Sequence, residues 1–573
     1  MYNQTKHKSK KHFCMFCLQH FTSEEILNKH KENCIEINGT QAIKMPDKSN
    51  NILKFNNFHK QLPVPFVIYA DFEALTEKVS GCKPNTDKSF THAYQKHTDR
   101  GYGYKVVCCY DAKYTKPIKI YRGPKAVYKF MEAMLKEIAY CKYVMKKYFN
   151  KPLKMTPSDE EQFQKASKCH ICGKEYKNND IKVRDHCHIT GVYRGSAHQN
   201  CNLNFQPTNK IPVIFHNLRG YDSHFIMQEI GQIVKDNKYT NKKGEECEMS
   251  INAIPNNMER YMAFMLGNNL TFIDSFQFMS SSLDKLVSNL PKDSFKYTSE
   301  QFKHNRLNLM IRKGVYPYDF MDSFNKFSEK LPSKEEFYSQ LNDQHISEED
   351  YQHATNVWEV FYLKNMGQYH DLYLKSDILL LADVFENFRK TCLQYYKLDP
   401  CHYFTAPGLS WDAMLKMTDI KLELMTDIDM FQFIEKGMQR GGVSYIAHRY
   451  GKANNKYMSD YDPKKPSKHI IYLDANNLYG YAMSKYLPTG NFKWLSQKKM
   501  DGLNLAEYEK DSKKGLILEV DLEYPEQLHD LHNSYPLAPE QIKVQKNMLS
   551  NYCKQKQQVV TFAHASSLLG STC

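Results

Sequence analysis

The sequence lacks the long apolar segments of a membrane protein. Its 573 residues hold no apolar run near the roughly 18 residues that a membrane-spanning helix needs. The polar, basic start of the chain is not followed by the apolar stretch of a secretory signal. From these absences we expect a protein that is neither bound to a membrane nor secreted.

Glycine and proline are sparse, at 24 and 22 residues, and the chain has no internal repeat and no long low-complexity tract. With 41% hydrophobic and 25% charged residues, this composition excludes a wholly disordered chain. A single core does not serve so long a chain, because domains contain about 150 residues on average. The sequence therefore predicts three or four domains.

Positive charge and aromatic rings are in excess. Lys and Arg number 78 against 64 Asp and Glu, a net charge of +14, and aromatic residues make up 13% of the chain. Cations neutralise phosphates and planar rings stack on bases, so nucleic acid is the leading partner class. An ordinary solvated surface explains the same charge equally well.

Acidic side chains follow two predicted strands. Asp71 and Glu73 come directly after an apolar, β-type run at 63–70. Because these two residues are two positions apart, they point to one side of an extended segment. Asp222 follows a second predicted strand, at 211–215.

A third group lies on a helix that the spacing of apolar residues predicts over 373–397. Tyr373 and Asp377 are four residues apart and share a face of that helix. Phosphoryl transfer by two metal ions needs several carboxylates brought together from separate segments. These segments supply such a set.

In this order the three segments resemble the Exo I, Exo II and Exo III motifs of the 3′–5′ proofreading exonuclease of family B DNA polymerases. The resemblance implies an RNase H-like fold, a mixed sheet flanked by helices. It implies that Tyr373 orients the attacking water and that Asn217 contacts the single-stranded primer end. The residues that it assigns as ligands of two Mg²⁺ or Mn²⁺ ions are Asp71, Glu73, Asp222 and Asp377.

Two shorter segments resemble further motifs of protein-primed polymerases. Ser282 and Leu283 begin a segment like the one that holds single-stranded DNA, and Gly441 and Gly442 match the glycines that link the exonuclease to the polymerase domain. The tyrosine expected before these glycines is absent. A helix cap for the serine and a flexible turn for the glycines are equal alternatives.

A strand predicted at 469–473 leads into Asp-Ala-Asn-Asn-Leu-Tyr-Gly, which resembles polymerase motif A. The resemblance implies that Asp474 binds the catalytic Mg²⁺ and that Tyr479 lies under the sugar of the incoming dNTP. The same segment resembles the polymerases of Polinton (Maverick) DNA transposons, which are type B enzymes of the organellar and viral kind. This resemblance implies a protein-primed enzyme, for which a terminal protein is a possible partner.

Motifs B and C of that family do not occur before Cys573. Residues 557–573 contain no Lys, Arg, Asp or Glu, unlike the rest of the chain. We therefore expect a C-terminally truncated polymerase that cannot extend a primer but has a complete exonuclease.

Two Cys and His clusters have the spacing of zinc sites. The first is typical of a ββα finger with Phe21 and Leu27 as its small core, and a unit of this size needs metal to fold. Contact with DNA and docking of a protein are both open to it. Its expected ligands are Cys14, Cys17, His30 and Cys34.

The second cluster resembles recombination endonuclease VII, a ββα-metal nuclease. The resemblance implies a general base, His186, and one Mg²⁺ held by Asp185 and Asn202. A purely structural role for this module is the alternative. The expected zinc ligands are Cys169, Cys172, His198 and Cys201.

We expect an α/β (α+β) multidomain protein that is a DNA-directed DNA polymerase, binding primer-template DNA and dNTPs and proofreading 3′ ends. A stand-alone metal-dependent DNA nuclease and a non-enzymatic zinc-finger remnant are the alternatives. DNA as the substrate and the basic leader indicate the nucleus. The expected domains are a finger at 1–40, a linker at 41–60, an exonuclease at 61–400 with the module inserted at 165–206, the start of a palm at 401–556 and a tail at 557–573.

Overall fold

The computed structural model divides the chain into two compact units, residues 54–420 and residues 1–53 with 421–573. In the described part no helix has both the length and the apolar character needed to cross a bilayer. The described residues are 12–14, 20–38, 45–79, 93–240, 244–257, 260–267, 269–437, 451–509, 512–521 and 523–532.

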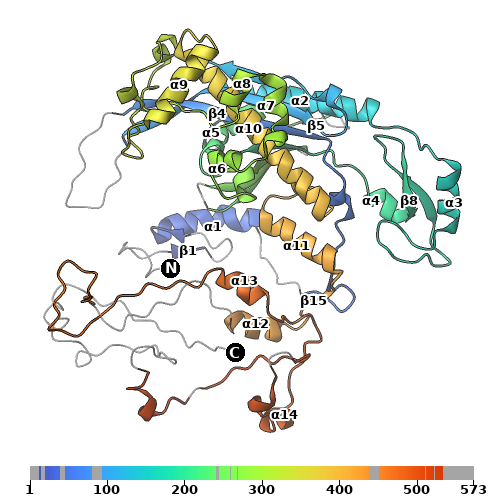
Figure 1. The fold of residues 1–573 in the computed structure, drawn as a ribbon. Coiled ribbons are helices and arrows are strands. Elements are labelled where there is room, and N and C mark those ends of the chain that lie inside the picture. The colour runs from blue at the N-terminus through green and yellow to red at the C-terminus, as the bar shows by residue number, and fades with distance from the viewer. Residues whose placement is uncertain are drawn as a thin grey trace. The chain divides into compact units, whose positions relative to one another are not determined.

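A mixed sheet of seven strands forms the centre of unit 54–420 (Figure 1). The strand order is β12-β13-β14-β9-β4-β5-β6, with β4, β9 and β14 parallel and the other pairs antiparallel. Helices flank this sheet, so the mixed sheet that the resemblance implied is present. The strands are β4 (Phe66–Lys78), β5 (Gln95–Cys108), β6 (Lys119–Arg122), β9 (Ile211–Phe215), β12 (Ile251–Pro255), β13 (Tyr261–Leu266) and β14 (Leu270–Asp274).

Strand β4 lies between β5 and β9 and is buried on both faces. Its even-numbered residues, such as Phe66 and Ile68, belong to one hydrophobic core, whereas Val67, Tyr69 and Leu75 belong to the core on the opposite face. The period of two places Asp71 and Glu73 on the second face. The predicted strand was too short, because β4 continues through both carboxylates to Lys78.

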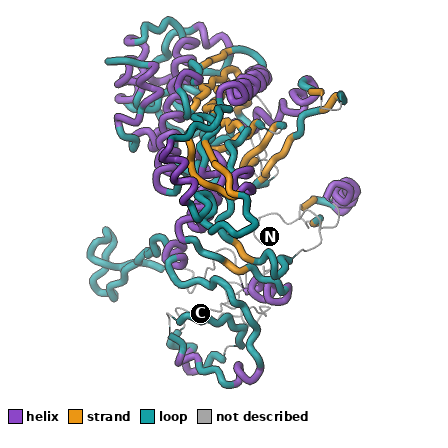
Figure 2. Tube along the Cα trace, turned by 90° about the vertical axis from the view of Figure 1, so that its right-hand side faces the viewer, coloured by secondary structure: helices purple, strands orange, loops and turns teal. Residues whose placement is uncertain are grey.

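The two faces of the sheet are covered by different helices. Helices α2 (Ala126–Tyr148) and α5 (Asp222–Asp236) pack on the first face, and α10 (Met366–Tyr395) packs on the second. Figure 2 shows the strands in orange among these purple helices. Helix α10 begins seven residues before the predicted start, where the Asn365 side chain accepts a hydrogen bond from the Gln368 N–H at 3.0 Å.

Smaller helices complete this unit, and α6 and α7 pack against α10. Two short strands pair outside the main sheet. These elements are α6 (Leu283–Ser288), α7 (Lys296–Gln301), α8 (Asn305–Met310), α9 (Glu348–Val360), α11 (Ala406–Thr418), β10 (Tyr239–Thr240) and β11 (Glu246–Cys247).

The inserted module follows α2 in the chain. Strands β7 (Lys182–His186) and β8 (Tyr193–His198) form an antiparallel hairpin, and α3 (Pro157–Lys165) and α4 (Gln199–Asn204) pack on it. The module has a small core of its own, which includes Ile171, Ala197 and Phe205. Figure 1 shows α3, β8 and α4 to one side of the seven-stranded sheet.

The N-terminal Cys/His segment forms the expected ββα unit. Strands β1 (His12–Phe13) and β2 (His20–Phe21) pair antiparallel, and α1 (Glu24–Asn38) follows them. Leu27 is buried and Phe21 packs beside it, which confirms the predicted small core.

The rest of the second unit contains little regular structure among the described residues. A strand was expected at 469–473, but these residues form none, and Ile471 and Leu473 are exposed. A strand needs a second strand to pair with its backbone N–H and C=O groups. Among the described residues of this unit, no strand pairs with residues 469–473. The elements present are β3 (Ile52–Leu53), paired with β15 (Leu422–Glu423), and helices α12 (Ile428–Gly437), α13 (Leu478–Met483) and α14 (Gln497–Asp501).

Candidate active site

A cluster of carboxylates forms where β4 meets α10. Oxygen atoms of Asp71, Glu73 and Asp377 lie within 4.8 Å of one another. Helix α10 approaches the sheet closely at two glycines of β5, because a Cβ atom on Gly101 or Gly103 would lie within 3 Å of an α10 side chain. These glycines pair with Glu73 and Asp71 across the ladder, so the close approach occurs beside the carboxylates.

A β-bulge follows Glu73 in the β4 ladder. A bulge bends a strand and redirects its side chains, and bulges are common next to active sites. The side chains of Glu73 and Asp377 are only 6% and 3% exposed, yet the Oδ1 atom of Asp377 has no hydrogen-bond partner within the described residues. Buried oxygens without partners are costly, which points to a missing positive ligand.

Asp222 is the first residue of α5 and is also buried, with an Oδ1 atom that lacks a partner among the described groups. It lies outside the three-residue cluster, but it faces it closely enough for the charges of Asp71 and Asp222 to affect each other. The structure therefore brings all four predicted carboxylates to one region of the sheet.

Burial and mutual repulsion raise the pKa values of these groups. Burial and the charge of Asp377 raise the pKa of Asp71 to about 7. The pKa of Glu73 lies well above its usual value because of burial and of Asp71 and Asp377, and burial and Asp71 raise the pKa of Asp222. Burial is the largest cause of each shift, and repulsion between the neighbouring carboxylates adds to it.

Lys313 is a cation at this cluster that the sequence analysis did not identify. Its Nζ atom donates to Asp377 Oδ2 at 2.5 Å and to the Tyr373 hydroxyl at 2.9 Å. Although burial opposes it, Asp377 keeps the pKa of Lys313 above its usual value. Lys313 lies 60 residues before Tyr373 in the chain. The only neighbouring feature of the sequence that could have drawn attention to this lysine is the glycine that follows it.

Gly314 lies against the Tyr373 ring, where a Cβ atom would be 2.9 Å from Cδ2. The Tyr318 hydroxyl is 2.9 Å from the Tyr373 hydroxyl. Tyr373 is thus held at the carboxylate cluster by a lysine, a second tyrosine and the packing at a glycine.

The loop that carries Asp222 is fixed by Asp274, which is fully buried at the end of β14 and was also missed. The Asp274 carboxylate accepts hydrogen bonds from the backbone N–H groups of Asn217 at 2.8 Å and Arg219 at 3.2 Å. Asn217 has a φ of 68°, a conformation that asparagine tolerates better than most residues. Its side chain is exposed at the edge of the site.

The module contains a cluster of three thiols and one imidazole, formed by the expected residues Cys169, Cys172, His198 and Cys201. His198 Nδ1 lies 3.5 Å from Cys172 Sγ, and His198 Nε2 contacts Asp180 Oδ2 at 3.3 Å. A carboxylate on the second nitrogen of a histidine ligand fixes its ring orientation. Burial opposes ionisation of Cys169, but backbone N–H donors lower its pKa to about 7. The donor set suits zinc.

The proposed nuclease residues of the module are arranged differently from the expectation. The Asp185 carboxylate is fully buried and accepts two hydrogen bonds from Arg194, at 2.7 and 2.8 Å, and it contacts His170 Nε2 at 2.8 Å. The rings of His186 and His188 lie 4.5 Å apart. The Asn202 backbone carbonyl accepts a hydrogen bond from the Gln206 side chain.

In the N-terminal unit, Cys14, His30 and Cys34 form a second cluster of zinc-binding type. The Cys14 and Cys34 sulfur atoms are 3.7 Å apart. The fourth expected ligand, Cys17, lies outside the described residues.

Comparison with known proteins identifies the family. The sequence model of "DNA polymerase type B, organellar and viral" matches residues 201–565, more than half of the chain. The chain belongs to this family of DNA polymerases. Residues 147–217 match the family model of recombination endonuclease VII.

A curated relative is the "Probable DNA polymerase" of Podospora anserina, which is 23% identical over 328 residues. The match covers 51% of this chain and 24% of the relative, so the chain spans about a quarter of the length of the protein that it matches.

Of the predicted DNA contacts, Ser282 caps α6 by accepting a hydrogen bond from the Lys285 N–H at 3.3 Å. Leu283 is 8% exposed and packs in the core beside α10, so the structure gives it a packing role. Gly441 and Gly442 lie outside the described residues.

The residues that resemble motif A do not form a site within the described part of their unit. Asp474 is exposed, and the Tyr479 side chain is 86% exposed on α13. Asn477 caps this helix by accepting a hydrogen bond from the Gly480 N–H at 3.2 Å. Their roles remain predictions that rest on the motif.

Proposed function

We propose that this member of the type B DNA polymerase family removes nucleotides from the 3′ end of single-stranded DNA with the carboxylates of β4, α5 and α10. The observation that carries the proposal is the convergence of Asp71, Glu73 and Asp377 within 4.8 Å. The fold of the sheet does not by itself explain why three acidic side chains are buried at one point.

The residues fit divalent cations. Asp222 and Asp377 each direct a buried oxygen without a hydrogen-bond partner among the described residues, and carboxylates are the ligands that Mg²⁺ and Mn²⁺ prefer. Asp71, Glu73, Asp222 and Asp377 would hold the ions. When bound, such ions neutralise developing charge on a phosphate and activate water.

The remaining side chains position the reacting groups. The Tyr373 hydroxyl, held by Lys313 and Tyr318, is available to orient a water molecule beside the carboxylates. Lys313 also fixes Asp377 and contributes positive charge next to the phosphate. Asn217 is exposed, and its assigned role in this proposal is contact with the single-stranded primer end.

Within the same proposal, the exonuclease proofreads for a polymerase domain that begins near Asp474 and uses dNTPs on primer-template DNA. The segment around Asp474 and Tyr479 supports a protein-primed enzyme of a Polinton-type element, with a terminal protein as partner.

Zn²⁺ in the finger and in the module would stabilise both small units. DNA replication of such an element would take place in the nucleus.

The test is digestion of a 5′-labelled single-stranded oligonucleotide by the full chain with Mg²⁺ or Mn²⁺. We expect a ladder of products shortened from the 3′ end. Asp71→Ala with Glu73→Ala is expected to reduce the rate on the order of 10³-fold, because several kcal/mol of charge stabilisation are lost. The matched control is Asp284→Ala with Glu300→Ala, which removes two carboxylates outside the cluster. Full activity of the Asp71 and Glu73 variant would refute the assignment.

A second candidate function is internal cleavage of DNA by the module. The family match and the adjacent rings of His186 and His188 favour it. Circular single-stranded DNA separates the two functions because it has no 3′ end. Cutting that is lost with His186→Ala and kept in the Asp71 and Glu73 variant would support the module, and an uncut circle would reject it.

A further inference from the structure

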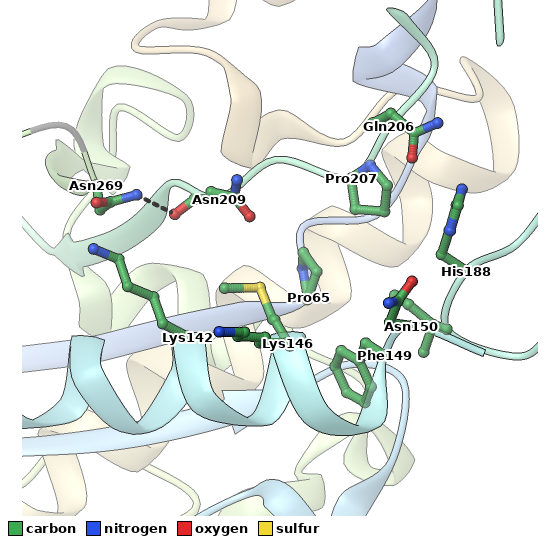
Figure 3. A pocket seen from close by; sticks show the side chains of 12 residues that line it. Pro65, Lys142, Lys146, Phe149, Asn150, His188, Gln206, Pro207, Asn209 and Asn269 are labelled. Carbon is green, nitrogen blue, oxygen red and sulfur yellow. Dashed lines mark hydrogen bonds between the residues drawn. The ribbon is translucent and has the colours of Figure 1, made fainter. Parts of the chain in front are cut away.

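A cavity of about 630 Å³ lies between α2, the inserted module and the start of β9 (Figure 3). Its polar lining comes from four separate segments of unit 54–420. These side chains are Lys142, Lys146, Asn150, His188, Gln206, Asn209 and Asn269.

The cavity is separate from the carboxylate cluster. Pro65, which lines it, precedes the first residue of β4, whereas Asp71 lies six residues further along. At about 3.3 Å per residue, the two sites are roughly 20 Å apart along the strand. The cavity therefore lies toward the opposite end of the parallel strands from the proposed exonuclease site.

The cavity is positively charged. Lys142 and Lys146 are one helical turn apart on α2 and both line the cavity, and Figure 3 shows the Lys142 side chain extending toward Asn209. No ion pair to either ammonium group is found in the described part of the chain, and no Asp or Glu lines the cavity. Two like charges at this spacing repel each other, so an anion bound here would relieve an unfavourable interaction.

Amide groups on the other walls can donate and accept hydrogen bonds. The Asn269 side chain donates to the Asn209 backbone carbonyl at 3.0 Å, which fixes the wall that faces the lysines. The side chain of Asn209 itself is exposed and has no hydrogen-bond partner within the described residues. Lysines beside amide side chains form a lining that suits phosphate oxygens and base edges rather than an apolar molecule.

We propose that this cavity binds the phosphodiester backbone of a single DNA strand. Lys142 and Lys146 are separated by about 6 Å along the helix axis, a spacing that lets them contact neighbouring phosphates of an extended strand. The strand would pass His188, whose ring is 4.5 Å from that of His186. The inference rests on the proposed function only in taking DNA as the substrate, and it gives the polymerase a second DNA contact away from the exonuclease.

The experiment measures binding of a fluorescein-labelled oligothymidylate to the full chain by anisotropy over a range of salt concentrations. All proteins carry Asp71→Ala and Glu73→Ala so that the probe stays intact. Lys142→Gln with Lys146→Gln is compared with Lys129→Gln with Lys136→Gln, which removes the same charge from exposed positions of the same helix outside the cavity. A thermal melt of each protein checks that it is folded.

We expect the cavity variant to bind about tenfold more weakly and its salt slope to fall by about 1.4, since each lost contact with a single strand contributes about 0.7. The Lys129 and Lys136 variant should stay within about twofold of the parent. Equal weakening in both variants, or no weakening in either, would overturn the proposal. Competition by tripolyphosphate or by polyglutamate as strong as that by DNA would also overturn it, in favour of a free nucleotide or an acidic protein segment.

The outcome is independent of the exonuclease assignment. In a chain with its carboxylates intact, Lys142→Gln with Lys146→Gln should leave the digestion of a trinucleotide unchanged, because so short a substrate does not reach the cavity. Loss of that digestion would show that the two lysines act on the exonuclease site and would reject a separate strand contact.

Discussion

At the scale of single residues, the carboxylates were accessible to sequence reasoning and their neighbours were not. Asp71 and Glu73 directly follow a continuous apolar run, and Tyr373 and Asp377 share a helix face, so each pair is visible in the local sequence. Lys313 and Asp274 act through contacts between segments that are distant in the chain. A lone lysine or aspartate has no spacing that reveals such a contact.

Lys313→Gln is expected to lower the exonuclease rate constant about 100-fold, because the variant loses the cation that holds both Asp377 and the Tyr373 hydroxyl. Single-turnover digestion of the labelled strand measures this. Lys303→Gln, at an exposed position ten residues earlier, is the control. Unchanged turnover in the Lys313 variant would show that this lysine does not position the site.

His353 gives a residue-scale prediction for pH. Burial and Arg312 lower its pKa to about 4, so the folded chain stays neutral at this residue while the unfolded chain gains a proton below about 6.5. The free energy of unfolding should therefore fall as the pH drops from about 6.5 to about 4. His353→Leu should reduce this fall by about 2 kcal/mol in urea titrations, whereas His345→Leu, at an exposed position, should not. Identical pH profiles for all three proteins would contradict the assignment.

At the scale of elements, the apolar pattern of the sequence predicted β9 and most of α10, because β9 is a fully buried apolar run and α10 has regularly spaced apolar residues. The extension of β4 through its carboxylates was missed, since acidic residues are uncommon in buried strands. The strand predicted at 469–473 was wrong in the described structure, because an apolar run specifies a strand only when another strand pairs with it.

The packing of α10 on β5 can be tested at Gly101. A Cβ atom there would lie 2.6 Å from Nε2 of the buried His370 ring, which Tyr316 fixes through a 2.7 Å hydrogen bond. Gly101→Ala should lower the free energy of unfolding by about 1 to 3 kcal/mol and slow the exonuclease by displacing α10.

Gly231→Ala is the matched control, because this exposed glycine of α5 has nothing within 4 Å of an added Cβ atom. It should raise stability by up to about 1 kcal/mol through helix propensity. Chemical denaturation measures both values. Equal stability of the two variants would mean that the helix does not depend on the glycine contact.

At the scale of the whole molecule, the chain combines a seven-stranded mixed sheet flanked by helices, a segment that matches the endonuclease VII family and an N-terminal ββα unit. The order of motifs in the sequence predicted these three parts. Local spacing was sufficient for the Cys/His sets, because their ligands are close in sequence. It was not sufficient for the cavity on α2, whose walls come from segments that only the folded chain brings together.

Zinc content tests the modular organisation. We expect about two tightly bound zinc ions per chain by mass spectrometry of metals. Cys172→Ser should remove the ion of the module and leave that of the finger, Cys34→Ser should do the reverse, and Cys247→Ser should change neither. Retention of both ions in the Cys172 variant would disprove the module site.

The most direct test of the central claim is a titration of the full chain with Mn²⁺ followed by electron paramagnetic resonance. The convergent carboxylates predict two neighbouring ions with a spin-coupled signal, reduced to at most one uncoupled ion by Asp71→Ala with Glu73→Ala. The same Mn²⁺ stoichiometry and the same spectrum in the variant and the parent would contradict the account.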